Sequence, residues 1–114
     1  MTARDDRRPD GTHRVVVTGM GAVTGFGVGL ARYWDGVCNG RSAIRATSRS
    51  FEDMQIERPC ATIDGYDPTE HFTNTELLIN EPFSQFAQLA AREAVADAGL
   101  DPGSLTDAAV TLVD

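Results

Sequence analysis

The sequence lacks lysine entirely, so all ten of its basic residues are arginine, and only 7% of its 114 residues are aromatic. It has no apolar run near the roughly 18–20 residues that cross a bilayer. Residues 1–13 have mixed charge and no apolar stretch, which excludes a secretory signal and predicts a disordered tail. The net charge is −7, with no basic stripe. These absences argue against membrane and nucleic-acid partners, and we expect a cytoplasmic location.

Cysteine and histidine are also scarce, with two of each. Cys38 and Cys60 form no CxxC pair and are too few for a metal site, so we expect reduced, partly buried thiols. His13 lies in the tail and His71 in a polar segment, and both are expected at the surface. Neither pattern is typical of Cys–His catalysis. The sequence therefore predicts no catalytic, cofactor-binding or metal-ligating residue, and no cofactor.

Three arginines, Arg41, Arg45 and Arg49, follow one another with no acidic residue between them. A spacing of four would align them on a helix, but the neighbouring glycine and serines favour a loop. We expect a solvated segment. The alternative is a contact with an acidic surface.

A short β-branched run at residues 15–17 leads into five glycines between positions 19 and 29. Such a run is typical of a strand covered on both faces, and the glycines indicate sharp turns or close backbone contacts. A second apolar run occupies residues 108–113. We predict that the two runs form neighbouring parallel strands joined by a right-handed crossover, which indicates an α/β fold with an incomplete sheet.

Two longer helices are predicted between these runs. Apolar residues recur at helical spacing over residues 30–38, and Asn39-Gly40 is a stop signal. Residues 80–98 carry an alanine-rich face, with Asn80 as the expected N-cap and Gly99 as the C-terminal stop. Because small side chains permit close approach, we expect this helix to be deeply packed. Residues 41–80 show no sustained periodicity, apart from a brief helix at 67–70.

The strand followed by Gly19-Met20-Gly21 also fits a nucleotide-binding oxidoreductase in part. The fingerprint Gly-x-Gly-x-x-Gly fails at its last position, which is Thr24. The short-chain dehydrogenase variant fails too, because two extra residues would displace the pyrophosphate from the helix N-terminus. An NAD(P)-binding fragment is therefore only a remote alternative.

Several segments together resemble the N-terminus of a β-ketoacyl synthase. They are residues 18–24 (TGMGAVT), Tyr33-Trp34, residues 39–44 (NGRSAI) and residues 83–100 (FSQFAQLAAREAVADAGL). The resemblance covers residues 14–114 and is strongest to type II polyketide ketosynthases and chain-length factors. It implies a partial thiolase-like fold, in which residues 14–114 begin the first α/β/α half. It also implies decarboxylative Claisen condensation, an acyl carrier protein as partner, and a homo- or heterodimeric ketosynthase.

The chain departs from this family at two places. Gly25 stands where the family usually has proline, and residues 76–81 (ELLINE) stand where many ketosynthases have a basic stretch that contacts the acidic carrier protein. Leu77-Leu78 resembles chain-length factors, whereas residues 84–87 resemble the catalytic subunit. The family's cysteine and histidine motifs are not matched here. We therefore expect a scaffold portion without catalysis of its own. A non-catalytic split or chain-length-factor-like subunit, docking with a companion ketosynthase, is the alternative.

Overall fold

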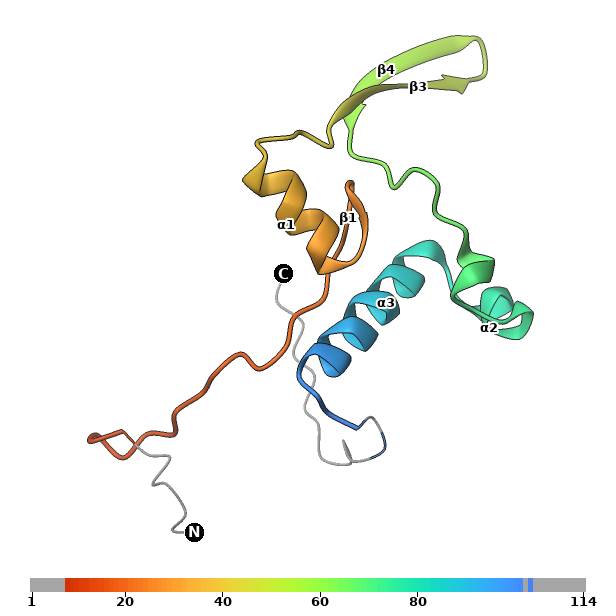
Figure 1. The fold of residues 1–114 in the computed structure, drawn as a ribbon. Helices are drawn as coiled ribbons and strands as arrows, with labels where there is room; N and C mark the ends of the chain where they lie inside the picture. The colour runs from red at the N-terminus through yellow and green to blue at the C-terminus, as the bar shows by residue number, and fades with distance from the viewer. Residues whose placement is uncertain (1–7, 102, 104–114) are drawn as a thin grey trace.

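The computed structural model describes residues 8–101 and 103, which form a mixed arrangement of helices and short antiparallel strands (Figure 1). In chain order the elements are β1 (Val23–Thr24), β2 (Gly27–Val28), α1 (Leu30–Cys38), β3 (Arg45–Phe51), β4 (Met54–Cys60), the 3-10 helix η1 (Pro68–Glu70), α2 (Asn74–Ile79) and α3 (Pro82–Asp97). The architecture is compatible with part of an α/β domain.

The two longer helices and the brief one form where the sequence predicts them. Helix α1 ends at Cys38, and the side chain of its C-cap, Asn39, donates to the Asp35 backbone oxygen at 2.8 Å. Gly40 follows with φ 62°. Glycine adopts this left-handed backbone without a steric cost. Before η1, the Asp67 carboxylate accepts from the Thr69 amide at 2.9 Å. Local turn chemistry therefore fixes these boundaries.

Helix α3 begins one residue later than a helix capped by Asn80 would. Its N-cap is Glu81, with Pro82 in the first turn, and Asn80 instead caps the C-terminus of α2. Proline suits this first position because its missing N–H would have no partner inside the helix. The predicted glycine stop is confirmed, since Gly99 has φ 67°.

The predicted strand at residues 15–17 is wrong for this structure. These residues form no ladder, and the three valine side chains are between 73% and 86% exposed. A strand needs a neighbour for its hydrogen bonds, and the predicted partner run, residues 108–113, lies outside the described residues. The sheets that the structure does describe are both antiparallel, not parallel.

The predicted loop around Arg45 and Arg49 is also wrong. Both arginines lie in β3, which pairs with β4 in a seven-residue antiparallel ladder from Arg45 opposite Cys60 to Phe51 opposite Met54. Figure 1 shows this hairpin standing away from α1 and α3. Its strands are mostly polar and exposed, so they lack the alternating apolar pattern that marks a half-buried strand.

The core is small, and α3 is not deeply packed along its whole length. Among the described residues, the buried side chains with apolar character are Phe72 and Leu89, and Gln85 is a buried polar one. Phe83, predicted on the packed face of α3, is 72% exposed. No helix within residues 8–101 is both long and apolar enough to cross a membrane.

Candidate functional site

The glycine turn, defined here as residues 19–30, lies directly against the backbone of α3. A Cβ atom on Gly19 would come within 2.2 Å of the Ala94 carbonyl oxygen, and one on Gly21 within 2.0 Å of the Ala90 carbonyl oxygen. No side chain fits at such distances. The close backbone contact that the glycines indicate is confirmed at these two positions, and the structure shows that the partner is the alanine-rich face of α3.

Two carboxylates of α3 bind backbone amides of the glycine turn. Glu93 accepts from the Ala22 amide at 2.9 Å and from the Leu30 amide at 2.8 Å. Asp97 accepts from the Met20 amide at 2.9 Å. Helix α1 has no side-chain cap at its own N-cap, Gly29, so Glu93 supplies the anion that a helix N-terminus favours.

This arrangement bears on the nucleotide-binding alternative. In that alternative, free amides at a glycine turn and helix N-terminus would bind the pyrophosphate. Here the amides of Met20, Ala22 and Leu30 already donate to carboxylates of the chain itself. A phosphate at this position would meet two negative groups. The geometry is that of an internal clamp between the turn and α3, and it argues against a dinucleotide site.

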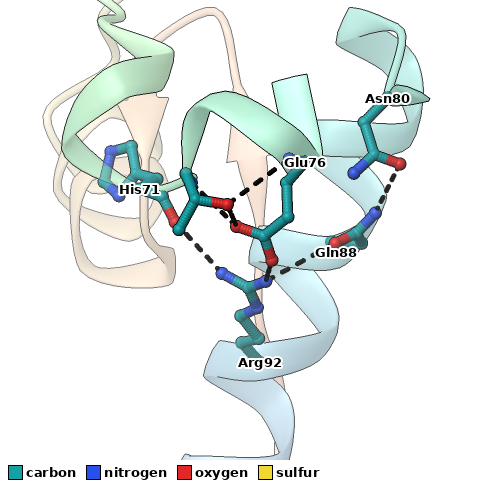
Figure 2. Close-up of polar contacts among 6 residues, drawn as sticks. His71, Glu76, Asn80, Gln88 and Arg92 are labelled. Carbon is teal, nitrogen blue, oxygen red and sulfur yellow. Dashed lines mark hydrogen bonds and ion pairs between the residues drawn. The ribbon is translucent and has the colours of Figure 1, made fainter. Parts of the chain in front are cut away.

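A second polar cluster joins α2 to α3 around Arg92 (Figure 2). The guanidinium donates to the His71 backbone oxygen at 3.3 Å, lies 3.6 Å from a Glu76 carboxylate oxygen, and stands 4.8 Å from the centroid of the buried Phe72 ring. One cation thus ties the end of η1, the start of α2 and the middle of α3 together. Its cation–π contact lies over one of the few buried rings.

Helix α2 itself was not predicted, although a local signal for it exists. Thr73 and Glu76 form a capping box, in which the Thr73 amide donates to the Glu76 carboxylate at 2.8 Å and the Thr73 hydroxyl accepts from the Glu76 amide at 3.4 Å. The Thr-x-x-Glu spacing is the sequence signature of this motif. The Thr73 hydroxyl also donates to the Glu76 carboxylate, at 2.9 Å. The hydrogen bonds that the carboxylate accepts from the Thr73 amide and hydroxyl, and to a lesser degree the charge of Arg92, hold the pKa of Glu76 below its ordinary value.

The buried polar side chain, Gln85, has partners for both ends of its amide. Its oxygen accepts from the Tyr66 hydroxyl at 2.9 Å, and its nitrogen donates to the Asn80 backbone oxygen at 2.8 Å. Tyr66 also packs edge-on against Phe86, with ring centroids 5.0 Å apart. Burial, together with the neighbouring Asp67 carboxylate, raises the pKa of Tyr66 above its ordinary value. Both the hydroxyl and the ring of Tyr66 are thus engaged in contacts with α3.

The cysteines and histidines are not brought together into a reactive group. Cys38 and Cys60 are both free and exposed, so the prediction of partly buried thiols is wrong. Cys38 ends α1 and Cys60 ends β4, where their side chains face solvent. His13 is exposed as predicted, whereas His71 is half-buried and stacks on Tyr66 at 5.9 Å. Within the described part of the chain, no group of three or more His, Cys, Asp or Glu could hold a metal ion.

The surface just before α3 is apolar and acidic. Leu78, Ile79 and Phe83 are between 72% and 84% exposed, and Glu81 is exposed beside them. Arg92 is the cation of this region, and it is engaged with Glu76 and His71. Residues 76–83 therefore present no free positive charge at this surface.

The comparisons with known proteins agree with the resemblance in the sequence. Residues 12–113 match the model of the β-ketoacyl synthase N-terminal domain. The putative polyketide β-ketoacyl synthase 1 of Streptomyces halstedii is 41% identical over 79% of this chain and 21% of its own length. The actinorhodin polyketide putative β-ketoacyl synthase 2 of Streptomyces coelicolor is 34% identical over 82% of this chain and 23% of its own.

A 3-oxoacyl-[acyl-carrier-protein] synthase 2 of Synechocystis is 36% identical over 76% of this chain and 21% of its own length. The chain thus spans about a fifth of the length of the curated relatives it matches. No solved structure matches it.

Proposed function

The chain belongs to the β-ketoacyl synthase family, and on that premise we propose that it supplies the N-terminal framework of a subunit for acyl-chain elongation in polyketide or fatty-acid biosynthesis. The observation that carries this proposal is the match of residues 12–113 to the N-terminal domain of that family. Residues 14–114 would begin a thiolase-like domain after a tail at residues 1–13. The proposal includes a cytoplasmic location.

The elongation reaction needs groups that we do not assign to this chain. In a decarboxylative Claisen condensation, a cysteine thiolate carries the acyl group, and a carbanion formed by loss of CO2 from a malonyl thioester attacks its carbonyl. Hydrogen-bond donors then stabilise the oxyanion. Cys38 and Cys60 are exposed and pair with no histidine among the described residues, which supports a framework role. The catalytic residues would lie in sequence that the relatives have beyond this match.

The clamp between the glycine turn and α3 supports the framework role. Glu93 and Asp97 fix the turn, and with it the start of α1, to one face of α3. A rigid first layer of this kind positions loops that follow it in a larger enzyme. The partners of the complete subunit would be an acyl carrier protein and a second ketosynthase-type subunit.

A second candidate is a chain-length-factor-like or split subunit that performs no condensation and docks with a companion ketosynthase. The exposed Leu78 and Ile79 and the absence of a free cation before α3 favour it, because charge complementarity steers an acidic carrier to a basic surface. The names of the Streptomyces coelicolor relatives include both a synthase 1 and a synthase 2.

A segment exchange tests the proposal and separates the two candidates. Residues 12–113 would replace the matching segment of either the Streptomyces coelicolor synthase 1 or synthase 2, and each chimera would be assayed with the other, unaltered synthase. We expect chain elongation in at least one chimera and none from the 114-residue chain alone. Activity of only the synthase 2 chimera would favour the second candidate. Condensation by the isolated chain would overturn the framework role.

A further inference from the structure

The β3–β4 hairpin presents one face that no other described element covers. Residues directly opposite each other in an antiparallel pair share a face, as do alternate residues along a strand. The ladder register therefore defines what we call the arginine face, which comprises Arg45, Thr47, Arg49 and Phe51 from β3 and Met54, Ile56, Arg58 and Cys60 from β4. The opposite face carries Glu57 and otherwise uncharged side chains.

The arginine face holds three cations and no acidic residue in a chain of net charge −7. Arg45 lies 2.5 Å from an Asp64 carboxylate oxygen. Arg49 and Arg58 are exposed, and neither forms an ion pair with any residue that the structure describes. Two guanidinium groups on neighbouring strands are therefore available to a carboxylate from outside, which each can bind through two parallel hydrogen bonds.

Between these arginines the face is hollowed and apolar. A depression of about 500 Å³ is lined by Arg49, Phe51, Ile56 and Arg58, together with Thr47, Ser50 and Cys60. Phe51 and Met54, which pair at the outer end of the hairpin, are 68% and 63% exposed. An apolar floor flanked by two cations fits a surface that offers carboxylates around one apolar side chain.

Other occupants fit this face less well. A second copy of the chain would bring the same arginines against it, which like-charge repulsion opposes. Nucleic acid would approach a strongly acidic chain with only two free cations on this face. An anionic membrane would meet Glu52 and Asp53, which occupy the tip of the hairpin beside Phe51 and Met54.

We propose that the arginine face of the hairpin is a docking surface for an acidic protein partner. Two carboxylates of that partner bind Arg49 and Arg58, and an apolar side chain enters the depression between Phe51 and Ile56. This inference goes beyond the proposed function and does not depend on it, because the charges and the exposed face belong to the hairpin alone.

The test titrates the complete 114-residue chain with a synthetic helical peptide of glutamate and leucine, and with matched peptides in which glutamine or lysine replaces glutamate. Binding is followed by amide NMR shifts. The R49E/R58E variant reverses the two free cations. The R8E/R14E variant has the same net charge and leaves the hairpin intact, and is the matched control. Both altered pairs are exposed, so neither is expected to unfold the chain.

We expect the glutamate peptide to bind at least tenfold more weakly to R49E/R58E, and to bind R8E/R14E within about twofold of the parent chain. Shifts should map to β3 and β4, and the lysine peptide should gain affinity for R49E/R58E. Equal binding to the parent and to R49E/R58E, shifts confined to other elements, or no binding to the parent chain would overturn the proposal. So would stronger binding to phosphatidylglycerol vesicles than to the peptide.

Discussion

In the glycine turn, backbone amides donate to carboxylates of α3 far along the chain, whereas the strands of the β3–β4 hairpin pair with each other. The turn is held by contacts with α3 that leave no room for a side chain. The hairpin is held by local pairing and exposes nearly all of its side chains. The turn is therefore the more constrained of the two regions, and the hairpin is the more exposed.

The largest effect is expected from adding bulk where the turn meets α3. The substitution Gly21→Val places a side chain about 2 Å from the Ala90 carbonyl oxygen, so the turn must separate from the helix. We expect a loss of at least about 3 kcal/mol, or failure to fold, measured by urea unfolding followed by circular dichroism. Gly65→Ala is the control, because its Cβ would meet nothing within 4 Å and only its positive φ costs about 1 kcal/mol. Equal effects of the two would contradict the clamp.

Replacing one phenylalanine by alanine in the packed body and one in the hairpin should change stability by different amounts. Phe72→Ala removes a ring that is 5% exposed and lies under Arg92, and we expect a loss of about 3 kcal/mol. Phe51→Ala removes a ring that is 68% exposed on the hairpin, and we expect less than about 0.5 kcal/mol. Thermal and urea unfolding of both variants would measure the difference. A comparable loss at Phe51 would mean that the hairpin is packed more firmly than its exposure indicates.

Removing the carboxylate that caps α1 should have a smaller effect. Glu93→Ala leaves the amides of Ala22 and Leu30 without their acceptor, and we expect about 2 kcal/mol of destabilisation. Hydrogen exchange at those two amides should accelerate more than exchange in β3 and β4. Glu57→Ala, which removes an exposed carboxylate from the hairpin, is the matched control and should leave stability nearly unchanged. Unaltered protection of Leu30 in the Glu93 variant would refute the capping role.

The smallest effect concerns the capping box of α2 and its response to acid. The pKa of Glu76 is lowered in the folded chain, so its stabilising contribution is present above the ordinary value of 4.5 and is lost as the pH falls through the lower folded value. Thr73→Ala should cost about 1 kcal/mol at neutral pH and flatten this acid dependence. The free energy of unfolding, measured from about pH 6 to about pH 3 for both chains, checks the loss of stability and its acid dependence. An unchanged acid slope would show that Thr73 does not set the pKa of Glu76.

The sequence predicts the elements whose signals are local. Helix α1 has its apolar face and its Asn39-Gly40 stop, and η1 has Asp67 ahead of proline. The glycines indicated a close backbone contact, which Gly19 and Gly21 make, but the sequence did not identify α3 as the partner. The family was identified from four segments taken together in their order and spacing, and the match of residues 12–113 confirms it. The segments are residues 18–24, 33–34, 39–44 and 83–100.

The rest depends on partners that local sequence does not reveal. Valines at residues 15–17 read as a buried strand, but a strand needs a neighbour, and the described residues offer none. The hairpin went unpredicted because its strands are polar and its turn, Glu52-Asp53, contains no glycine although Glu52 has φ 51°. The sequence did not indicate that Glu93 binds the amides of the glycine turn. A carboxylate on a helix is ordinarily solvated, and Glu93 acts as an acceptor only because the tertiary structure brings those amides to it.

Gly25 lies where the two ends of the hairpin return to the body of the chain. A Cβ there would come within 2.8 Å of the Ala43 side chain and 2.9 Å of the Ala61 side chain, so any larger residue would have to displace one of these alanines. Ala43 and Ala61 flank the hairpin and both lie against Gly25, so the two ends of the hairpin are held at one point of the chain. A hairpin from a relative could be grafted between these two alanines, and partner choice could then change in evolution or by design while the body of the chain stays as it is.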